Sequence, residues 1–502
     1  MRFFSRAPVH IAYKWRVTIV IALGMIMSIM DSTIVNIAIP QMQHAFGANL
    51  HDLQWVVTIY MLTQAAVIPS APYLNAIFGG KRVYLWTLTA FLLGSLLCGF
   101  AWNLPSLIFF RLLQGIGGGI LLPIVMILQY QVFPREERGM ATSVMGMAMM
   151  VAPTLGPVLG GYLVSSFGWQ WAFFINLPLG IVAVILAQKT LQPTPPQIRT
   201  RFDIFGFLTA AAGSAIVVYA VSTIVSGATS IENVLLLLGG LVLLCTFVII
   251  ELLKTRSGQK PLLDLRRFRD RAFTCSTLTQ IIVFFIWFGV LFLIPIYLQT
   301  LHRETAIQAG LIQGALALAP LAILPFGGKL ADRLGPRPIV MVGLLVLACA
   351  FALMMTLALN TPIWMIVGFL FLLGCQGGLT NQIPVSALSQ IKKEEEQEIA
   401  NASTLLAVLR AAAAPLGVAI FASFVQNRSQ YYMESLSRQG IAGAVLQPQS
   451  ILFAMHESFL SASVLALVAF AVMAFVPRRK KSQDRQQAFS SEKSVLLSRK
   501  RA

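Results

Sequence analysis

The chain has 502 residues, of which 57% are hydrophobic and 11% are charged. Apolar runs of about twenty residues recur from end to end, which excludes an ordinary soluble domain and indicates an all-α polytopic membrane protein. The formal net charge is +18, which on a soluble chain would suggest a nucleic-acid partner. The placement of these charges decides between the two interpretations.

Fourteen apolar segments are long enough to cross a bilayer. The run behind the basic N-terminus is too long for a signal peptide and lacks a small-residue cleavage site, so it is predicted to be the first span. The segments lie near residues 16–39, 53–76, 82–102, 105–131, 141–165, 172–190, 203–224, 233–253, 273–298, 307–330, 337–358, 362–388, 400–424 and 452–476.

The basic residues are distributed unevenly about these segments. With the N-terminus placed inside, inner segments hold 32 of the 37 Lys and Arg residues, and the outer loops hold only Arg303, Arg428 and Arg438. This asymmetry follows the positive-inside rule. Both termini are therefore predicted to be cytoplasmic, in a multi-pass protein of the cytoplasmic membrane, and the charge requires no nucleic-acid partner.

The segment Gly146 to Gly161, G-M-A-M-M-V-A-P-T-L-G-P-V-L-G-G, carries two prolines and four glycines inside a predicted span. Pro153 and Pro157 lie four residues apart and bend the same face. Gly156 and Gly160 form a small-xxx-small face on which another backbone can pack closely. This pattern indicates a bent helix at a hinge between helices. A kinked packing helix without a role in transport is an equal alternative.

The identities of the residues in this stretch point to a family more specifically than the spacing of its prolines and glycines. A-P-T-L-G-P-V-L-G-G resembles the fifth-helix antiporter motif of drug exporters in the major facilitator superfamily. W-Q-W-A-F-F-I-N-L-P-L-G, Trp169 to Gly180, resembles the start of helix six in the fourteen-span drug:proton antiporter family. The resemblance implies a major facilitator fold of two six-helix halves plus two inserted helices, with substrate held between the halves.

Weak internal repeats agree with that architecture. Pro69 and Gly79 match Pro325 and Gly335 at one offset of 256 residues, so spans 1–6 correspond to spans 9–14 and spans 7 and 8 are inserted. The predicted organisation is a first six-helix half, a linker with two extra helices and a cytoplasmic amphipathic loop, a second six-helix half, and a basic cytoplasmic tail. These parts cover residues 1–190, 191–271, 272–477 and 478–502, respectively.

Asp31 is the only carboxylate deep within a predicted span. It lies in M-D-S-T-I-V-N-I-A-I-P, Met30 to Pro40, which resembles the first-span signature of the antiporter family. An acidic residue inside a membrane is costly and usually functional, so Asp31 is the candidate proton carrier. The alternative is a structural hydrogen bond to a neighbouring helix.

Arg111 lies in L-I-F-F-R-L-L-Q-G-I-G-G-G, which resembles the fourth-span motif whose arginine the family uses in proton transfer. At 1.5 Å per residue, Arg111 and Asp31 lie about 9 and about 12 Å below the outer ends of their spans. These matching depths predict a direct or water-bridged contact. Gln114 follows one turn later on the same face and is a candidate cavity residue. The alternative for Arg111 is a cation that snorkels outward.

The stretch Gly327 to Pro338, G-G-K-L-A-D-R-L-G-P-R-P, resembles the cytoplasmic gating loop of the superfamily. The resemblance assigns Asp332, Arg333 and Arg337 to a charge cluster that holds the inner gate closed. The corresponding first-half loop has Ala76 in place of the aspartate, so gating is predicted to depend more on the second half.

Aromatic and cationic residues supply further cavity candidates. Trp55, Tyr60 and Tyr297 could line an adaptable pocket, although lipid-facing or interfacial roles are the alternative for most such residues. Arg410 lies mid-span, where the family often has an arginine, and either faces the central cavity or pairs with Asp31. The sequence contains no nucleotide loop, metal cluster or nucleophile constellation, so neither enzymatic activity nor a cofactor is expected.

Together these features predict a proton-coupled antiporter that exports amphipathic or cationic drug-like compounds by alternating access. The alternatives are an exporter of an endogenous lipid or metabolite on the same scaffold and a non-transporting membrane receptor. The expected partners are a small-molecule substrate, protons and the lipid bilayer. The chain is expected to act as a monomer, with a membrane-fusion adaptor if the host has two membranes.

Overall fold

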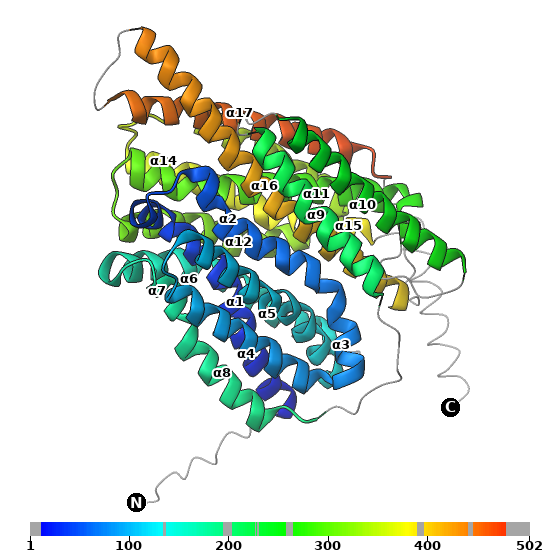
Figure 1. Cartoon of the computed structure of the whole chain (residues 1–502). Helices are drawn as coiled ribbons and strands as arrows, with labels where there is room; N and C mark the ends of the chain where they lie inside the picture. Colours follow the sequence, from blue (N-terminus) through cyan, green and yellow to red (C-terminus); the bar gives the residue numbers. More distant parts are fainter. Residues whose placement is uncertain are drawn as a thin grey trace, which may run out of the picture.

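The computed structural model describes residues 12–133, 137–193, 203–225, 227, 230–257, 265–388, 396–439 and 445–477. Within these ranges the chain is helical and forms no strand, and its helices run side by side in one bundle (Figure 1). Twelve described helices are long and apolar enough to cross a membrane, and α6 and α12 contribute shorter apolar stretches. The predicted all-α, fourteen-helix fold is therefore confirmed.

The first half consists of the helices up to residue 190. In chain order these are α1 (Tyr13–Phe46), α2 (Leu50–Val67), η1 (Ile68–Ser70), α3 (Ala71–Phe78), α4 (Gly80–Gly99), α5 (Leu104–Val132), α6 (Arg138–Phe167), α7 (Trp171–Phe174) and α8 (Asn176–Thr190). Two inserted helices follow, namely α9 (Ile204–Val225) and α10 (Ile231–Arg256).

The second half begins after the inserted pair. It comprises η3 (Leu265–Arg269), α11 (Arg271–Ile296), the short π-helix η4 (Tyr297–Leu301), α12 (Ala306–Leu334), α13 (Pro336–Met354), α14 (Ile363–Thr380), α15 (Ile383–Ala387), α16 (Glu396–Arg438) and α17 (Leu446–Ala474). The basic tail and part of the predicted amphipathic loop lie outside the described residues.

Equivalent turns in the two halves share one backbone conformation. Gly79 separates α3 from α4 with a φ of 80°, and Gly335 separates α12 from α13 with a φ of 86°. A positive φ favours glycine, which has no Cβ to clash with the backbone. The two turns occupy positions that the offset of 256 residues pairs, so the internal sequence match is also a structural one.

The halves pack through α6 against α12 and through α2 against α16. Hydrogen bonds also join the halves near Gly47, where α1 ends and α2 begins. This end of the bundle is called the Gly47 end below. Gln299 Nε2 donates to the Ile37 carbonyl at 3.0 Å, and His51 Nδ1 lies 3.0 Å from the Ser423 hydroxyl. The halves therefore close on each other at the Gly47 end, which the charge pattern predicts to be the outer end.

Helix α16 is longer than predicted. The expected span covers 400–424, whereas the helix contains 43 residues and is about 65 Å long at 1.5 Å per residue. Its polar extension packs on α17, where Arg428 Nε lies 2.5 Å from Glu457 Oε2. Arg428 and Arg438 therefore belong to a helix rather than to an outer loop, which corrects the sequence-based placement.

The predicted sidedness can be tested by cysteine labelling in a background without the five native cysteines. Asn360 is exposed between α13 and α14, and Ser257 is exposed where α10 ends, at the opposite end of the bundle. In intact cells, Asn360→Cys should react with a membrane-impermeant maleimide, whereas Ser257→Cys should react only after permeabilisation. Equal labelling of both variants in intact cells would contradict the topology.

Candidate functional site

A buried polar cluster occupies the interior of the first half. Asp31 comes from α1, Arg111 and Gln114 from α5, and Asn176 from the first position of α8; the exposed fraction of each is 0%. Arg111 Nη1 donates to Asp31 Oδ2 at 2.7 Å. Gln114 Nε2 and Asn176 Nδ2 donate to Asp31 Oδ1 at 2.9 and 2.7 Å. Three helices thus converge on one carboxylate.

Arg111 is also fixed by contacts beyond its bond to Asp31. Its Nε donates to the Val56 carbonyl of α2 at 2.9 Å, and its Nη1 also donates to Gln114 Oε1 at 2.7 Å. The guanidinium carbon lies 3.9 Å from the centroid of the Tyr60 ring, which is a cation–π distance. With an exposed fraction of 0%, the side chain does not snorkel toward solvent, so that alternative is excluded.

Burial makes the hydrogen bonds of this cluster essential. An ion pair in a low-dielectric interior is maintained only when hydrogen bonds compensate the lost hydration, and removing one charge costs about 3–5 kcal/mol. Arg111 and the two amide donors supply these hydrogen bonds to Asp31.

Sequence reasoning did not single out Asn176 or Ser95. Asn176 Nδ2 also lies 3.0 Å from Ser95 Oγ, which donates to the Phe173 carbonyl at 2.9 Å. The sequence signal was present, because Asn176 is an amide inside the apolar run I-N-L-P-L-G. The break between α7 and α8 places it opposite α1, and that break could not be inferred from periodicity.

The remaining aromatic candidates are dispersed through the bundle. Tyr60 lies beneath Arg111, with its hydroxyl 3.5 Å from Ser28 Oγ. Trp55 packs against Tyr219 of the inserted helix α9, with ring centroids 5.9 Å apart. These contacts place Tyr60 at the buried cluster and Trp55 at the seam with α9. Their cavity roles stay predictions.

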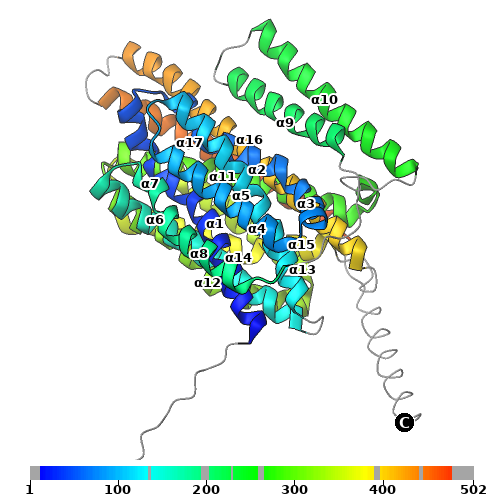
Figure 2. The ribbon, with the colours of Figure 1, turned by 60° about the horizontal axis from the view of Figure 1, so that its bottom comes forward.

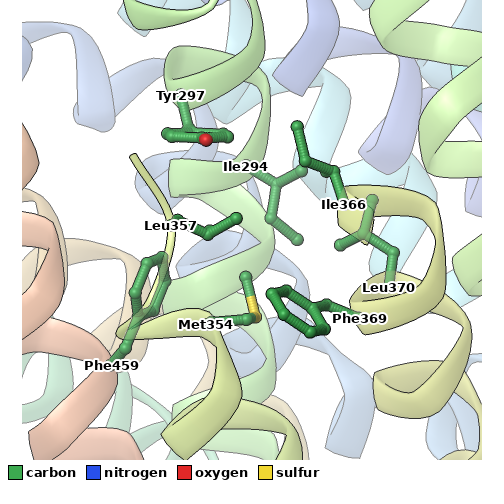
Figure 3. Close-up of a pocket in the computed structure, with 8 residues that line it drawn as sticks. All are labelled: Ile294, Tyr297, Met354, Leu357, Ile366, Phe369, Leu370 and Phe459. Atoms are coloured by element: carbon green, nitrogen blue, oxygen red, sulfur yellow. The ribbon is translucent and has the colours of Figure 1, made fainter. Parts of the chain in front are cut away.

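Tyr297 lines a small apolar cavity inside the second half, between α11, α13, α14 and α17 (Figure 3). Its hydroxyl donates to the Ala358 carbonyl at 2.8 Å. Arg410 is half-buried, and its guanidinium carbon lies 5.2 Å from the centroid of the Phe284 ring. The described partners of Asp31 all come from the first half, so Arg410 stacks on an aromatic ring of its own half instead of pairing with Asp31.

The antiporter stretch places α6 between two other helices. A Cβ at Gly156 would overlap the Thr33 hydroxyl of α1, and one at Gly160 would meet the Ile34 side chain at 3.2 Å. The neighbouring Gly161 faces the second half, where a Cβ would overlap the Ala306 carbonyl oxygen of α12. The small-residue face therefore packs within the first half, and Gly161 forms the contact between the halves.

Pro157 also takes part in the contact between the halves. A Cβ at Gly310 of α12 would overlap the Pro157 carbonyl oxygen, so the two backbones approach closely from both sides. The side chain of Pro153, four residues earlier, lies outside the described residues. Its expected contribution to the bend stays a prediction.

The gating stretch lies at the end of the bundle opposite Gly47. Arg337 Nη2 donates to the Ala474 carbonyl at 2.5 Å and so caps the last turn of α17. Arg333 is exposed, and the side chain of Asp332 lies outside the described residues. The predicted charge cluster therefore stays a prediction, although Arg337 links α13 to α17.

A fourteen-helix bundle of two paired halves, with a charge cluster buried inside the first half, is typical of a polytopic membrane transporter. The chain belongs to the Major Facilitator Superfamily, because the model of that family matches residues 21–418. Its architecture also resembles solved members of transporter families. The peptide transporter POT in complex with sulfate superposes with a TM-score of 0.67 at 14% identity, covering 95% of this chain and 96% of that one.

Three bacterial relatives are about 30% identical to this chain over the aligned residues. The multidrug transporter protein MdtP of Bacillus subtilis is 31% identical over 81% of this chain and 74% of its own length. The riboflavin transporter RibZ of Clostridioides difficile is 30% identical over 83% and 90%. The uncharacterized MFS-type transporter YhcA of B. subtilis is 33% identical over 68% of this chain, which spans 64% of YhcA.

Proposed function

We propose that the protein is a proton-coupled antiporter that exports amphipathic or cationic drug-like compounds across the cytoplasmic membrane by alternating access. The observation that carries the proposal is the fully buried carboxylate of Asp31, held by three donors from α5 and α8. A fully buried carboxylate next to a cation can bind or release a proton when the local structure changes. The multidrug relative MdtP supports a drug-like substrate.

Helix α1 connects this carboxylate to the contact between the halves. Six residues after Asp31, the Ile37 carbonyl accepts a hydrogen bond from Gln299 of the second half. Helix α6 packs on α1 at Gly156 and on α12 at Gly161. Protonation of Asp31 removes the charge that holds Arg111, so α1 and α5 can shift and loosen these contacts. This contiguous packing is the route by which a proton would bias the two access states.

The proposed membrane location follows from the charge pattern, and the proposed domain plan follows from the predicted spans and the internal repeat. Both termini lie in the cytoplasm, and the chain divides at residues 190, 271 and 477 into the two halves, the inserted pair and the tail. We further propose that the protein acts as a monomer, and that it requires an adaptor only in a host with two membranes.

An efflux assay tests the proposed function as a whole. Cells that carry the protein should expel ethidium faster than vector controls. A protonophore should abolish the difference, because the transport would depend on the proton gradient. Efflux that persists unchanged after the gradient has been collapsed would contradict proton coupling.

A second candidate is export of an endogenous metabolite, favoured by the similarity to RibZ. Proteoliposomes that contain the protein can be tested with riboflavin and, separately, with ethidium. Uphill transport of riboflavin without transport of ethidium would favour export of an endogenous metabolite. The reverse result would favour export of drug-like compounds.

A further inference from the structure

The inserted helices attach to the bundle mainly through α9. Helix α10 packs on α9 and near η3, and its Phe247 joins the buried cluster that contains Phe273 and Ala402, but many large apolar side chains along α10 are exposed. Figure 2 shows the pair at the edge of the bundle, with α9 toward α2 and α16 and α10 outward. The inner face of α9 therefore makes most of the contacts between the inserted pair and the two halves.

That face carries a buried polar junction at the Gly47 end. Gln54 of α2, Ser222 of α9 and Ser423 of α16 each have an exposed fraction of 0%. Gln54 Nε2 donates to Ser222 Oγ at 2.6 Å and lies 3.4 Å from Ser423 Oγ, and the two hydroxyls are 2.9 Å apart. Three chain segments, one from each half and one from the insertion, thus meet in a single hydrogen-bonded group.

The attachment of α9 to the two halves is unequal. With the second half, α9 packs along its length: Ala210 lies against the cluster that contains Ala402, and Val218 packs with Ala419. Asn427 Nδ2 of α16 also donates to the Val225 carbonyl at 3.1 Å, where α9 ends.

Among the described residues, the main contacts of α9 with the first half come from α2. They comprise the Gln54 bond, the stacking of Trp55 on Tyr219, and apolar packing of Ile59 and Leu62 against the Val218 cluster. The packing therefore ties α9 to the second half more extensively than to the first.

We propose that α9 moves with the second half and acts as an additional seal at the Gly47 end. Ser222 holds Gln54 of the first half only while that end is closed, and the Ser222–Ser423 bond persists when it opens. The proposal assumes alternating access but not proton coupling. Unpaired polar groups are costly in an apolar interior, so the junction favours the closed state and makes its opening a discrete step.

The position of the closed-to-open equilibrium tests this seal. Spin labels at Ala45→Cys and Asn360→Cys, both exposed at the Gly47 end on opposite halves, would report the separation of the halves in a background without native cysteines. At a pH and substrate level where the parent protein populates both separations, Ser222→Ala should raise the open-to-closed ratio about threefold, a typical effect for one interhelical hydrogen bond in a membrane.

Matched variants separate a seal from a merely structural contact. Within the described residues, Ser461 of α17 donates its hydrogen bond to the Ser458 carbonyl of its own helix, so Ser461→Ala should leave the ratio unchanged. Gln54→Leu should shift the ratio in the same direction as Ser222→Ala, and the double variant should show less than the product of the two effects, because both remove the same bond. A monodisperse Ser222→Ala protein with the parent distance distribution would overturn the proposal.

A cross-link tests which half carries α9. The Ser222 and Ser423 hydroxyls lie 2.9 Å apart, so Ser222→Cys with Ser423→Cys should oxidise to a disulfide. Transport should continue after oxidation, because these helices move together. Transport that stops on oxidation and returns with reductant would show that α9 separates from the second half, and would overturn this part of the proposal. Loss of proton coupling in other variants would leave both readouts unaffected.

Discussion

Replacement of Asp31 by Asn should abolish uphill, gradient-driven efflux, reducing it to the level of vesicles without the protein. The amide has the size of the carboxylate but no proton to exchange, so it resembles the protonated state permanently. Arg111 would also lose the anion that lies 2.7 Å from its Nη1. Efflux against a concentration gradient in proteoliposomes measures the effect. The variant should still bind neutral substrates, because their contacts are apolar.

Two carboxylate variants make this result specific. Asp31→Glu should retain partial coupling, since the titrating group survives with a longer reach. Glu457→Gln is the matched control, because Glu457 is a partly exposed carboxylate near the Gly47 end that pairs with Arg428; partly exposed ion pairs contribute about 0–1 kcal/mol. If Asp31→Asn pumps uphill at the parent rate, the proton site lies elsewhere, and Glu457 becomes the next candidate.

Replacement of Gly161 by Leu should reduce transport about tenfold or more without preventing membrane insertion. The first side-chain carbon would overlap the Ala306 carbonyl oxygen and lie 3.0 Å from Ile307 Cα. Backbone atoms cannot rotate away as a flexible side chain can, and overpacking of this kind typically costs about 1–3 kcal/mol. The penalty falls on the state in which the Gly47 end is closed, so the variant should accumulate in the open state.

The control for Gly161→Leu is the same substitution at Gly239 of α10, where a Cβ has no neighbour within 4 Å. Both variants should reach the membrane at parent levels, as shown by surface labelling, and only Gly161→Leu should lose efflux. Parent-level efflux by a well-expressed Gly161→Leu protein would show that the close packing of α6 and α12 is not needed for transport.

Much of the fold could be predicted because a bilayer imposes simple rules. Hydropathy located the fourteen helices, and the internal match between Gly79 and Gly335 reappears as the same positive-φ turn in both halves. The matching depths of Asp31 and Arg111 predicted a contact that the structure contains. These features depend on length and burial, which a single sequence records directly.

Features that depend on tertiary packing were harder to predict. The polar end of α16 does not meet a hydropathy criterion, yet it stays helical and packs against α17, where Arg428 pairs with Glu457. Asn176 reaches Asp31 only because the chain breaks between α7 and α8. The junction around Ser222 joins residues about 170 and about 200 positions apart, and no local pattern connects positions so distant in sequence.

The most direct measurement of the central claim is proton release on substrate binding. Purified protein in weakly buffered detergent is mixed with a cationic substrate such as ethidium, and the change in pH is recorded with the parent protein and with Asp31→Asn. The parent protein should release protons in proportion to bound substrate, and Asp31→Asn should release none while remaining folded. Equal proton release by the two proteins would contradict the assignment of Asp31 as the coupling residue.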